Sequence, residues 1–137
     1  MKTVTLLSAL VAGTMLAAPV TASAQDDAQT KGQAELAELL EGRVAGEPQS
    51  CVRTLPSTPV NIIDGTALVV DRGSTIYVNI PDHPDSLDDN DALKIRKFGS
   101  GTQLCRTDII TTFDRTGGFY TGNVSLGDFV PYERVGG

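Results

Sequence analysis

The chain has 137 residues and a formal net charge of −6, from 11 lysines and arginines against 17 aspartates and glutamates. It contains two cysteines, one histidine and no tryptophan, which excludes a four-cysteine zinc site and a histidine-rich metal centre. The acidic balance argues against nucleic acid or an anionic membrane surface as the main partner.

The first 24 residues have the three parts of a secretory signal peptide. Lys2 supplies the positive region, Val4–Ala18 is an apolar run, and Ala22 and Ala24 are the small residues of a cleavage site. The apolar run is shorter than the roughly 20 residues that a membrane-spanning helix needs. We therefore predict a signal peptide at residues 1–24, export by the general secretory route, and a periplasmic or extracellular protein with no membrane span in the mature chain.

The next segment is predicted to contain a short helix. Residues 25–33 are polar and are expected to form a disordered lead-in. A helix of about ten residues should follow and end near Gly42, because apolar side chains recur at helical spacing at Leu36, Leu39, Leu40 and Val44. Its leucine stripe is expected to cover one end of the core or, alternatively, to bind a partner.

Beyond Pro48 the sequence alternates short β-type runs with turn residues. Residues 71–74 and 114–118 are good hairpin connections, and Pro131 places the last strand at a sheet edge or puts the proline at a strand end. Six to eight strands without βαβ alternation indicate a mainly β fold, a small antiparallel sandwich or barrel with one short N-terminal helix. Residues 34–137 are expected to form this single β-rich domain.

Cys51 and Cys105 are the two cysteines of the chain. Export would place them in an oxidising compartment, and no C-x-x-C redox motif surrounds them, so we predict one intramolecular structural disulfide. A bond that closes a loop of roughly 55 residues is expected to stabilise the fold by about 4 kcal/mol.

The densest polar segment spans residues 82–91. Its carboxylates could supply hard oxygen ligands for calcium, and the candidate ligands are Asp85, Asp88, Asp89 and Asp91. The segment lacks the D-x-D-x-D-G core and the distal glutamate of an EF-hand loop. An acidic surface loop explains the same residues, and both interpretations stay open.

Nucleophilic catalysis finds little support in the sequence. His83 is the single imidazole and would have to serve any Ser-His-Asp triad. It lies in a loop next to Pro84, and no serine occupies a G-x-S-x-G motif. We therefore predict no catalytic residue and no cofactor.

Five segments of the chain form a pattern when they are taken together. They are Gly42–Pro48 running into Cys51, Ile62–Ala67, Tyr77–Asn79, Gly101–Arg106 and Leu126–Tyr132. Over about residues 36–134 this pattern resembles a group of small exported bacterial proteins with no assigned function. The resemblance implies that the two cysteines belong together, and it implies no substrate, cofactor or partner.

The leading hypothesis is a non-enzymatic binding or structural module of the cell envelope, whose partner is an unknown protein or envelope component. One alternative is a metal-assisted or carboxylate-using hydrolase that employs the acidic segment. Another is an inhibitor of an extracellular enzyme, which would present a protruding hairpin at residues 71–74 or 114–118.

Overall fold

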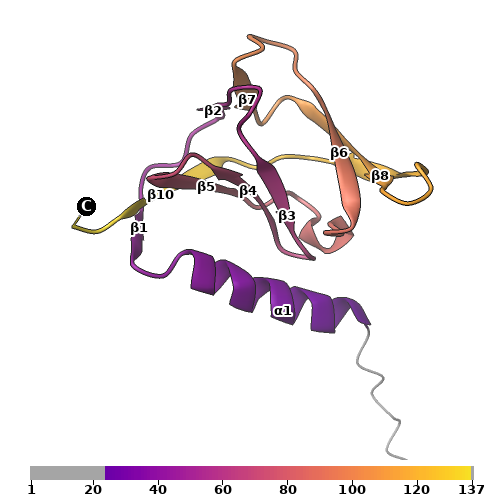
Figure 1. Cartoon of the computed structure of the whole chain (residues 1–137), viewed down its shortest axis with the longest axis horizontal. Helices are drawn as coiled ribbons and strands as arrows, with labels where there is room; N and C mark the ends of the chain where they lie inside the picture. Colours follow the sequence, from indigo (N-terminus) through magenta and orange to yellow (C-terminus); the bar gives the residue numbers. More distant parts are fainter. Residues whose placement is uncertain (1–23, 137) are drawn as a thin grey trace, which may run out of the picture.

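A computed structural model describes residues 24–136 of the chain and the side chains from residue 27 onward. The predicted signal peptide therefore lies outside the described residues, except for Ala24. The described part holds one α-helix, a short 3₁₀ helix and ten strands, all paired antiparallel (Figure 1). In chain order the elements are α1 (Ala24–Leu39), β1 (Arg43–Ala45), β2 (Cys51–Arg53), β3 (Val60–Ile63), β4 (Ala67–Asp71), β5 (Thr75–Asn79), η1 (Pro84–Ser86), β6 (Asp91–Arg96), β7 (Gln103–Cys105), β8 (Ile109–Asp114), β9 (Tyr120–Val124) and β10 (Phe129–Arg134).

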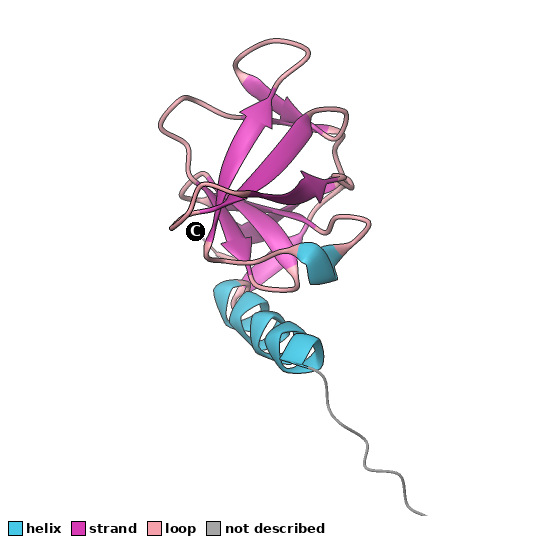
Figure 2. Cartoon of the chain, turned by 90° about the vertical axis from the view of Figure 1, so that its right-hand side faces the viewer, coloured by secondary structure: helices cyan, strands magenta, loops and turns pink. Residues whose placement is uncertain are grey.

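The strands form three sheets. Sheet A has the order β1-β10-β5-β4-β3, sheet B pairs β2 with β7, and sheet C has the order β6-β8-β9. Helix α1 covers one face of sheet A, while sheets B and C lie on its other face (Figures 1 and 2). The prediction of a mainly β, antiparallel fold with one N-terminal helix is confirmed.

Strand β4 contributes side chains to both hydrophobic cores, because it belongs to sheet A, which lies between α1 on one side and sheets B and C on the other. Side chains alternate between the two faces of a strand, so Leu68 and Val70 join Phe129 in the core shared with sheets B and C. Ala67 and Val69 point the other way and are buried beneath α1. This double burial explains why β4 is a continuous apolar run rather than an alternating one.

Helix α1 begins well before the predicted position, so residues 25–33, expected to be a disordered lead-in, are helical. Gly32 is buried where the helix meets the turn between β3 and β4. A Cβ atom at this position would overlap the carbonyl oxygen of Asp64 and the hydroxyl of Thr66. Because glycine has no side chain, the helix can approach the sheet closely at this position. Such a contact produces no apolar periodicity in the sequence, so the start of the helix was not predicted.

The end of the helix agrees with the prediction. Leu36 and Leu40 pack against the helix-facing core, and Gly42 takes the left-handed conformation with φ of 71°. Val44 was predicted to belong to the helical stripe, and this prediction is wrong. It lies in β1 and is 59% exposed, because the chain has already turned into sheet A.

Both predicted hairpins are present, and each connection uses a glycine with positive φ, Gly73 between β4 and β5 and Gly118 between β8 and β9. The apolar and threonine-rich stretch after Thr102 forms two strands, β7 and β8. The strand count rises from the predicted six to eight to ten, in part because the three-residue strands β1 and β2 were not predicted.

Pro131 was expected at a sheet edge or at a strand end, but β10 is an interior strand of sheet A and the proline lies within it. The carbonyl oxygen of Pro131 accepts a hydrogen bond from the amide of Gly46 at 2.7 Å. The nitrogen of Pro131, which has no hydrogen to donate, lies where the pairing between β1 and β10 ends. The proline therefore removes a single backbone hydrogen bond from the sheet.

The predicted disulfide between Cys51 and Cys105 is confirmed, with an S–S distance of 2.10 Å. The two residues lie directly opposite each other on β2 and β7. Their neighbours Ser50 and Arg106 are joined by a backbone hydrogen bond, so the cysteines occupy a non-hydrogen-bonded pair, where facing side chains are closest.

Candidate functional site

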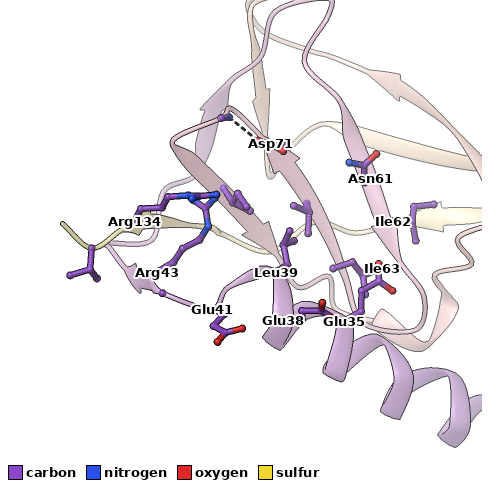
Figure 3. Close-up of a pocket in the computed structure, with 15 residues that line it drawn as sticks. Glu35, Glu38, Leu39, Glu41, Arg43, Asn61, Ile62, Ile63, Asp71 and Arg134 are labelled. Atoms are coloured by element: carbon purple, nitrogen blue, oxygen red, sulfur yellow. Dashed lines mark hydrogen bonds between the residues drawn. The ribbon is translucent and has the colours of Figure 1, made fainter. Parts of the chain in front are cut away.

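A hollow with a volume of about 980 Å³ lies between the C-terminal half of α1 and the helix-facing side of sheet A (Figure 3). We call it the helix–sheet groove. Its aliphatic floor is made by Ile63, Val69 and Ile76, which come from β3, β4 and β5, and Leu39 of α1 adds a fourth aliphatic side chain.

The two-residue alternation of the strands places these side chains on one face of the sheet. Asn61 shares this face with Ile63 on β3, and Asp71 shares it with Val69 on β4. Asp71 is held at the rim, where its carboxylate accepts a hydrogen bond from the Gly73 amide at 2.7 Å. The groove therefore combines an apolar floor with polar side chains along its edges.

Charged side chains of both signs line the groove. Glu35 and Glu38 come from helix α1 and Glu41 from the turn that follows it, while Arg43 and Arg134 come from the adjacent strands β1 and β10. Figure 3 shows both arginine side chains at one end of the groove, away from Glu35 and Glu38.

The two arginines differ in how they are held. Arg43 is half-buried, and its guanidinium donates hydrogen bonds to the carbonyl oxygens of Ser74 at 2.9 Å and Tyr132 at 3.3 Å. Arg134 is exposed and makes no side-chain hydrogen bond or ion pair within the described residues. The register pairs Arg43 directly with Arg134, so two positive charges face each other across the strands.

A second cluster lies at the opposite end of α1. Carboxylate oxygens of Asp64, Asp88 and Asp89 all lie within 4.8 Å of one another. Burial raises the pKa of Asp64, and the charges of Asp89 and Asp88 raise it further, while Lys31 and a backbone hydrogen bond from Asp89 act in the opposite direction. The raised pKa shows that the negative charge of Asp64 is poorly compensated.

The structure brings together two of the four predicted calcium candidates, Asp88 and Asp89. Asp85 is exposed on η1 and lies outside this trio. Asp91 is only 5% exposed at the start of β6, and its carboxylate accepts a hydrogen bond from the hydroxyl of Thr121 at 2.6 Å. It supports the packing of sheet C instead of facing the other aspartates, and calcium binding itself stays a prediction.

Sequence reasoning missed Asp64 because it lies 24 positions before Asp88. The only available signal was the Asp-Gly turn that closes β3, which brings this carboxylate to the same end of the fold as the acidic segment. His83 also proves to be a turn residue. It is exposed, and its carbonyl oxygen accepts hydrogen bonds from the amide and the hydroxyl of Ser86.

The two hairpin connections considered for an inhibitor are exposed. The first contributes Gly73 to the rim of the groove. The second projects from the side of the molecule (Figure 1), next to Phe119, whose side chain is 73% exposed.

None of the helices in residues 24–136 has the length and apolar character that crossing a membrane requires. No protein-family model, no curated protein and no solved structure matches this chain. The helix–sheet groove and the Asp64–Asp88–Asp89 cluster are therefore the two features from which a function can be argued.

Proposed function

We propose that this chain is an exported, non-enzymatic binding module of the cell envelope that takes its ligand in the helix–sheet groove. The groove itself is the observation that carries the proposal. Its volume of about 980 Å³ falls at the upper end of the range for small-molecule sites, roughly 300–1,000 Å³. Such sites combine apolar lining with a few placed polar groups, as Ile63, Val69 and the two arginines do here.

The way the groove is built supports a preformed site. Its floor belongs to the middle layer of the molecule, where Val69 and Ile76 are 3% and 2% exposed. Its wall is a helix docked through the glycine contact at Gly32 and through Leu36 and Leu40. A rigid floor and a docked wall reduce the ordering that a ligand must impose on binding.

Two features support export. Residues 1–24 have the composition of a signal peptide, and the Cys51–Cys105 bond is of the kind that persists in oxidising compartments. A partner drawn from the envelope follows from that location.

The experiment that tests the proposal compares a groove-filling variant with a matched variant elsewhere. Asn61 is exposed on β3 and lines the groove, so Asn61→Trp would fill it without removing a side-chain hydrogen bond. Asn123→Trp places the same side chain on β9, outside the groove, and removes the hydrogen bond that the side-chain carbonyl of Asn123 accepts from the hydroxyl of Thr111 at 3.1 Å. After incubation with envelope extract, native mass spectrometry should find a bound small molecule on the wild type and on Asn123→Trp.

We expect Asn61→Trp to emerge from the same incubation without the bound mass. Retention of that mass by Asn61→Trp, or a wild type that carries none, would show that the groove is not the binding site. A protein that co-purifies with all three forms would instead favour the inhibitor hypothesis.

A metal-assisted hydrolase is the second candidate, because three carboxylates lie within 4.8 Å of one another. Calcium should then raise the melting temperature of the wild type, and Asp64→Asn should abolish that rise. A melting temperature that millimolar calcium does not move would leave Asp88 and Asp89 as part of an acidic surface loop.

A further inference from the structure

The paired arginines at the end of the groove indicate what kind of ligand it binds, and the inference rests on the function proposed above. Arg43 on β1 and Arg134 on β10 are direct cross-strand partners. Like charges in this position destabilise an antiparallel pair. The ion pair between described residues is Arg106–Asp128, so neither Arg43 nor Arg134 is ion-paired with a carboxylate of the described part of the chain.

One of these guanidinium groups is already oriented. A single nitrogen, Nη1 of Arg43, donates to the carbonyl oxygens of Ser74 and Tyr132, and the other N–H groups of this side chain have no acceptor within the described residues. A guanidinium has five N–H donors in a planar fork that matches a carboxylate. An anion between Arg43 and Arg134 would accept charge-assisted hydrogen bonds from both and remove their repulsion.

The rest of the groove argues against a ligand that is only anionic. Glu35 and Glu38 lie on the helix wall at the side away from the arginines (Figure 3), and both are exposed. Their carboxylates would repel a simple anion and attract an ammonium group. The charges therefore match a ligand with a negative end, an aliphatic middle and a positive group.

The sheet order gives the scale of that ligand. Strands β5 and β4, which supply Ile76 and Val69, lie between β10 and β3. Three strand spacings separate β10 from β3, which is roughly 14 Å. An extended peptide of about four residues covers this distance, and its aliphatic side chains would lie between the two charged regions, against the exposed Leu39.

We propose that the helix–sheet groove binds a short peptide through its C-terminal carboxylate. The carboxylate lies between Arg43 and Arg134, and the aliphatic side chains of the peptide contact Leu39, which is 38% exposed in the groove. A basic group of the peptide faces Glu35 and Glu38. A fatty acid has a carboxylate and an aliphatic part as the peptide does, but it has no basic group that could face Glu35 and Glu38.

Calorimetric titration of the exported, disulfide-bonded chain tests this assignment. The probes are the peptide Lys-Val-Leu-Val with a free carboxylate, the same peptide as its C-terminal amide, and decanoate. Arg134 has no bonded partner to lose, so Arg134→Gln should leave the fold intact, and circular dichroism checks this. Arg96→Gln, an exposed arginine on β6, is the matched control.

We expect the free peptide to bind, and both the amide and the Arg134→Gln variant to weaken its affinity about tenfold, the effect of losing hydrogen bonds to a charged group. Arg134→Gln should not weaken binding of the amide further, and Arg96→Gln should bind as the wild type does.

The possible failures are distinguishable. Equal affinity for peptide and amide, or unchanged binding by Arg134→Gln, overturns the carboxylate assignment while the groove remains the binding site if Asn61→Trp blocks the peptide. Binding of decanoate without binding of the peptide replaces the peptide with an anionic amphiphile. Peptide binding that Asn61→Trp does not affect overturns both this inference and the proposed function.

Discussion

Replacing Gly32 with alanine would test whether α1 is docked as the structure describes. Gly32 faces the turn between β3 and β4, and a Cβ atom would overlap the carbonyl oxygen of Asp64 and the hydroxyl of Thr66. These two atoms are joined by a hydrogen bond of 2.9 Å. Neither can therefore move aside without breaking an interaction, and the helix itself would have to shift away from the sheet.

Two effects oppose each other in this variant, and their sizes decide the sign. Alanine is favoured over glycine inside a helix by about 1 kcal/mol. Forcing an extra carbon into a packed contact costs about 1–3 kcal/mol. Shifting the helix would also loosen the packing of Leu36 and Leu40 on the sheet. We expect a net loss of about 1 kcal/mol in the free energy of unfolding.

Urea unfolding followed by circular dichroism measures this change. Ala37 is exposed on the same helix, so Ala37→Gly reports helix propensity without the docking contact and should lose about 1 kcal/mol. If Gly32→Ala instead gains stability by the amount that Ala37→Gly loses, propensity alone governs the helix. The close contact with Asp64 and Thr66 would then have no energetic role, and the docking argument would be refuted.

Three further predictions follow from the structure. Replacing both Cys51 and Cys105 with serine should lower the free energy of unfolding by about 4 kcal/mol, because the disulfide closes a loop with a sequence separation of 54. Urea unfolding measures this free energy, and a denaturation midpoint equal to that of the wild type would contradict the prediction. Asp64→Asn should raise the melting temperature at neutral pH in the presence of a chelator. A carboxyl whose pKa is raised in the folded state contributes stability below its ordinary value of 3.8 and loses it as the pH rises through the raised pKa. The gain should therefore disappear in melts at acidic pH, and a gain that is independent of pH would exclude this cause. Asp91→Ala should cost about 1.5–3 kcal/mol, because it removes the 2.6 Å hydrogen bond that the buried carboxylate accepts from the hydroxyl of Thr121. The exposed Asp89 should tolerate alanine within about 0.5 kcal/mol. Equal denaturation midpoints for the two variants would contradict the assignment.

The sequence could predict those parts of the fold that depend on local signals. Both predicted hairpins form where glycine supplies a positive φ, at Gly73 and Gly118. Strands β1 and β2 escaped prediction because each has three residues and owes its conformation to a distant partner, β10 or β7. The start of α1 escaped it because Gly32 acts through a tertiary contact.

The candidate sites show the same division. Composition alone drew attention to Asp88 and Asp89, but their approach to Asp64 depends on how the β3–β4 turn meets the acidic segment. The arginine pair could not be predicted, because Arg43 lay at the end of a predicted helix and Arg134 lies far from it in the chain. Only the register between β1 and β10 brings the two side chains together.

The position of α1 connects the two candidate sites. Toward its N-terminal half the helix meets the β3–β4 turn at Gly32, beside the backbone carbonyl oxygen of Asp64, and toward its C-terminal end Glu35 and Glu38 form the wall of the groove. The floor of the groove is fixed by the buried strands of sheet A, whereas its wall rests on the glycine contact and on two half-buried leucines. Because a helix moves largely as a rigid body, a change at the Asp64 turn that shifts α1 would also move Glu35 and Glu38 relative to the arginines. The spacing between the charged regions, on which recognition of a peptide would depend, is therefore set by the docking of this one helix.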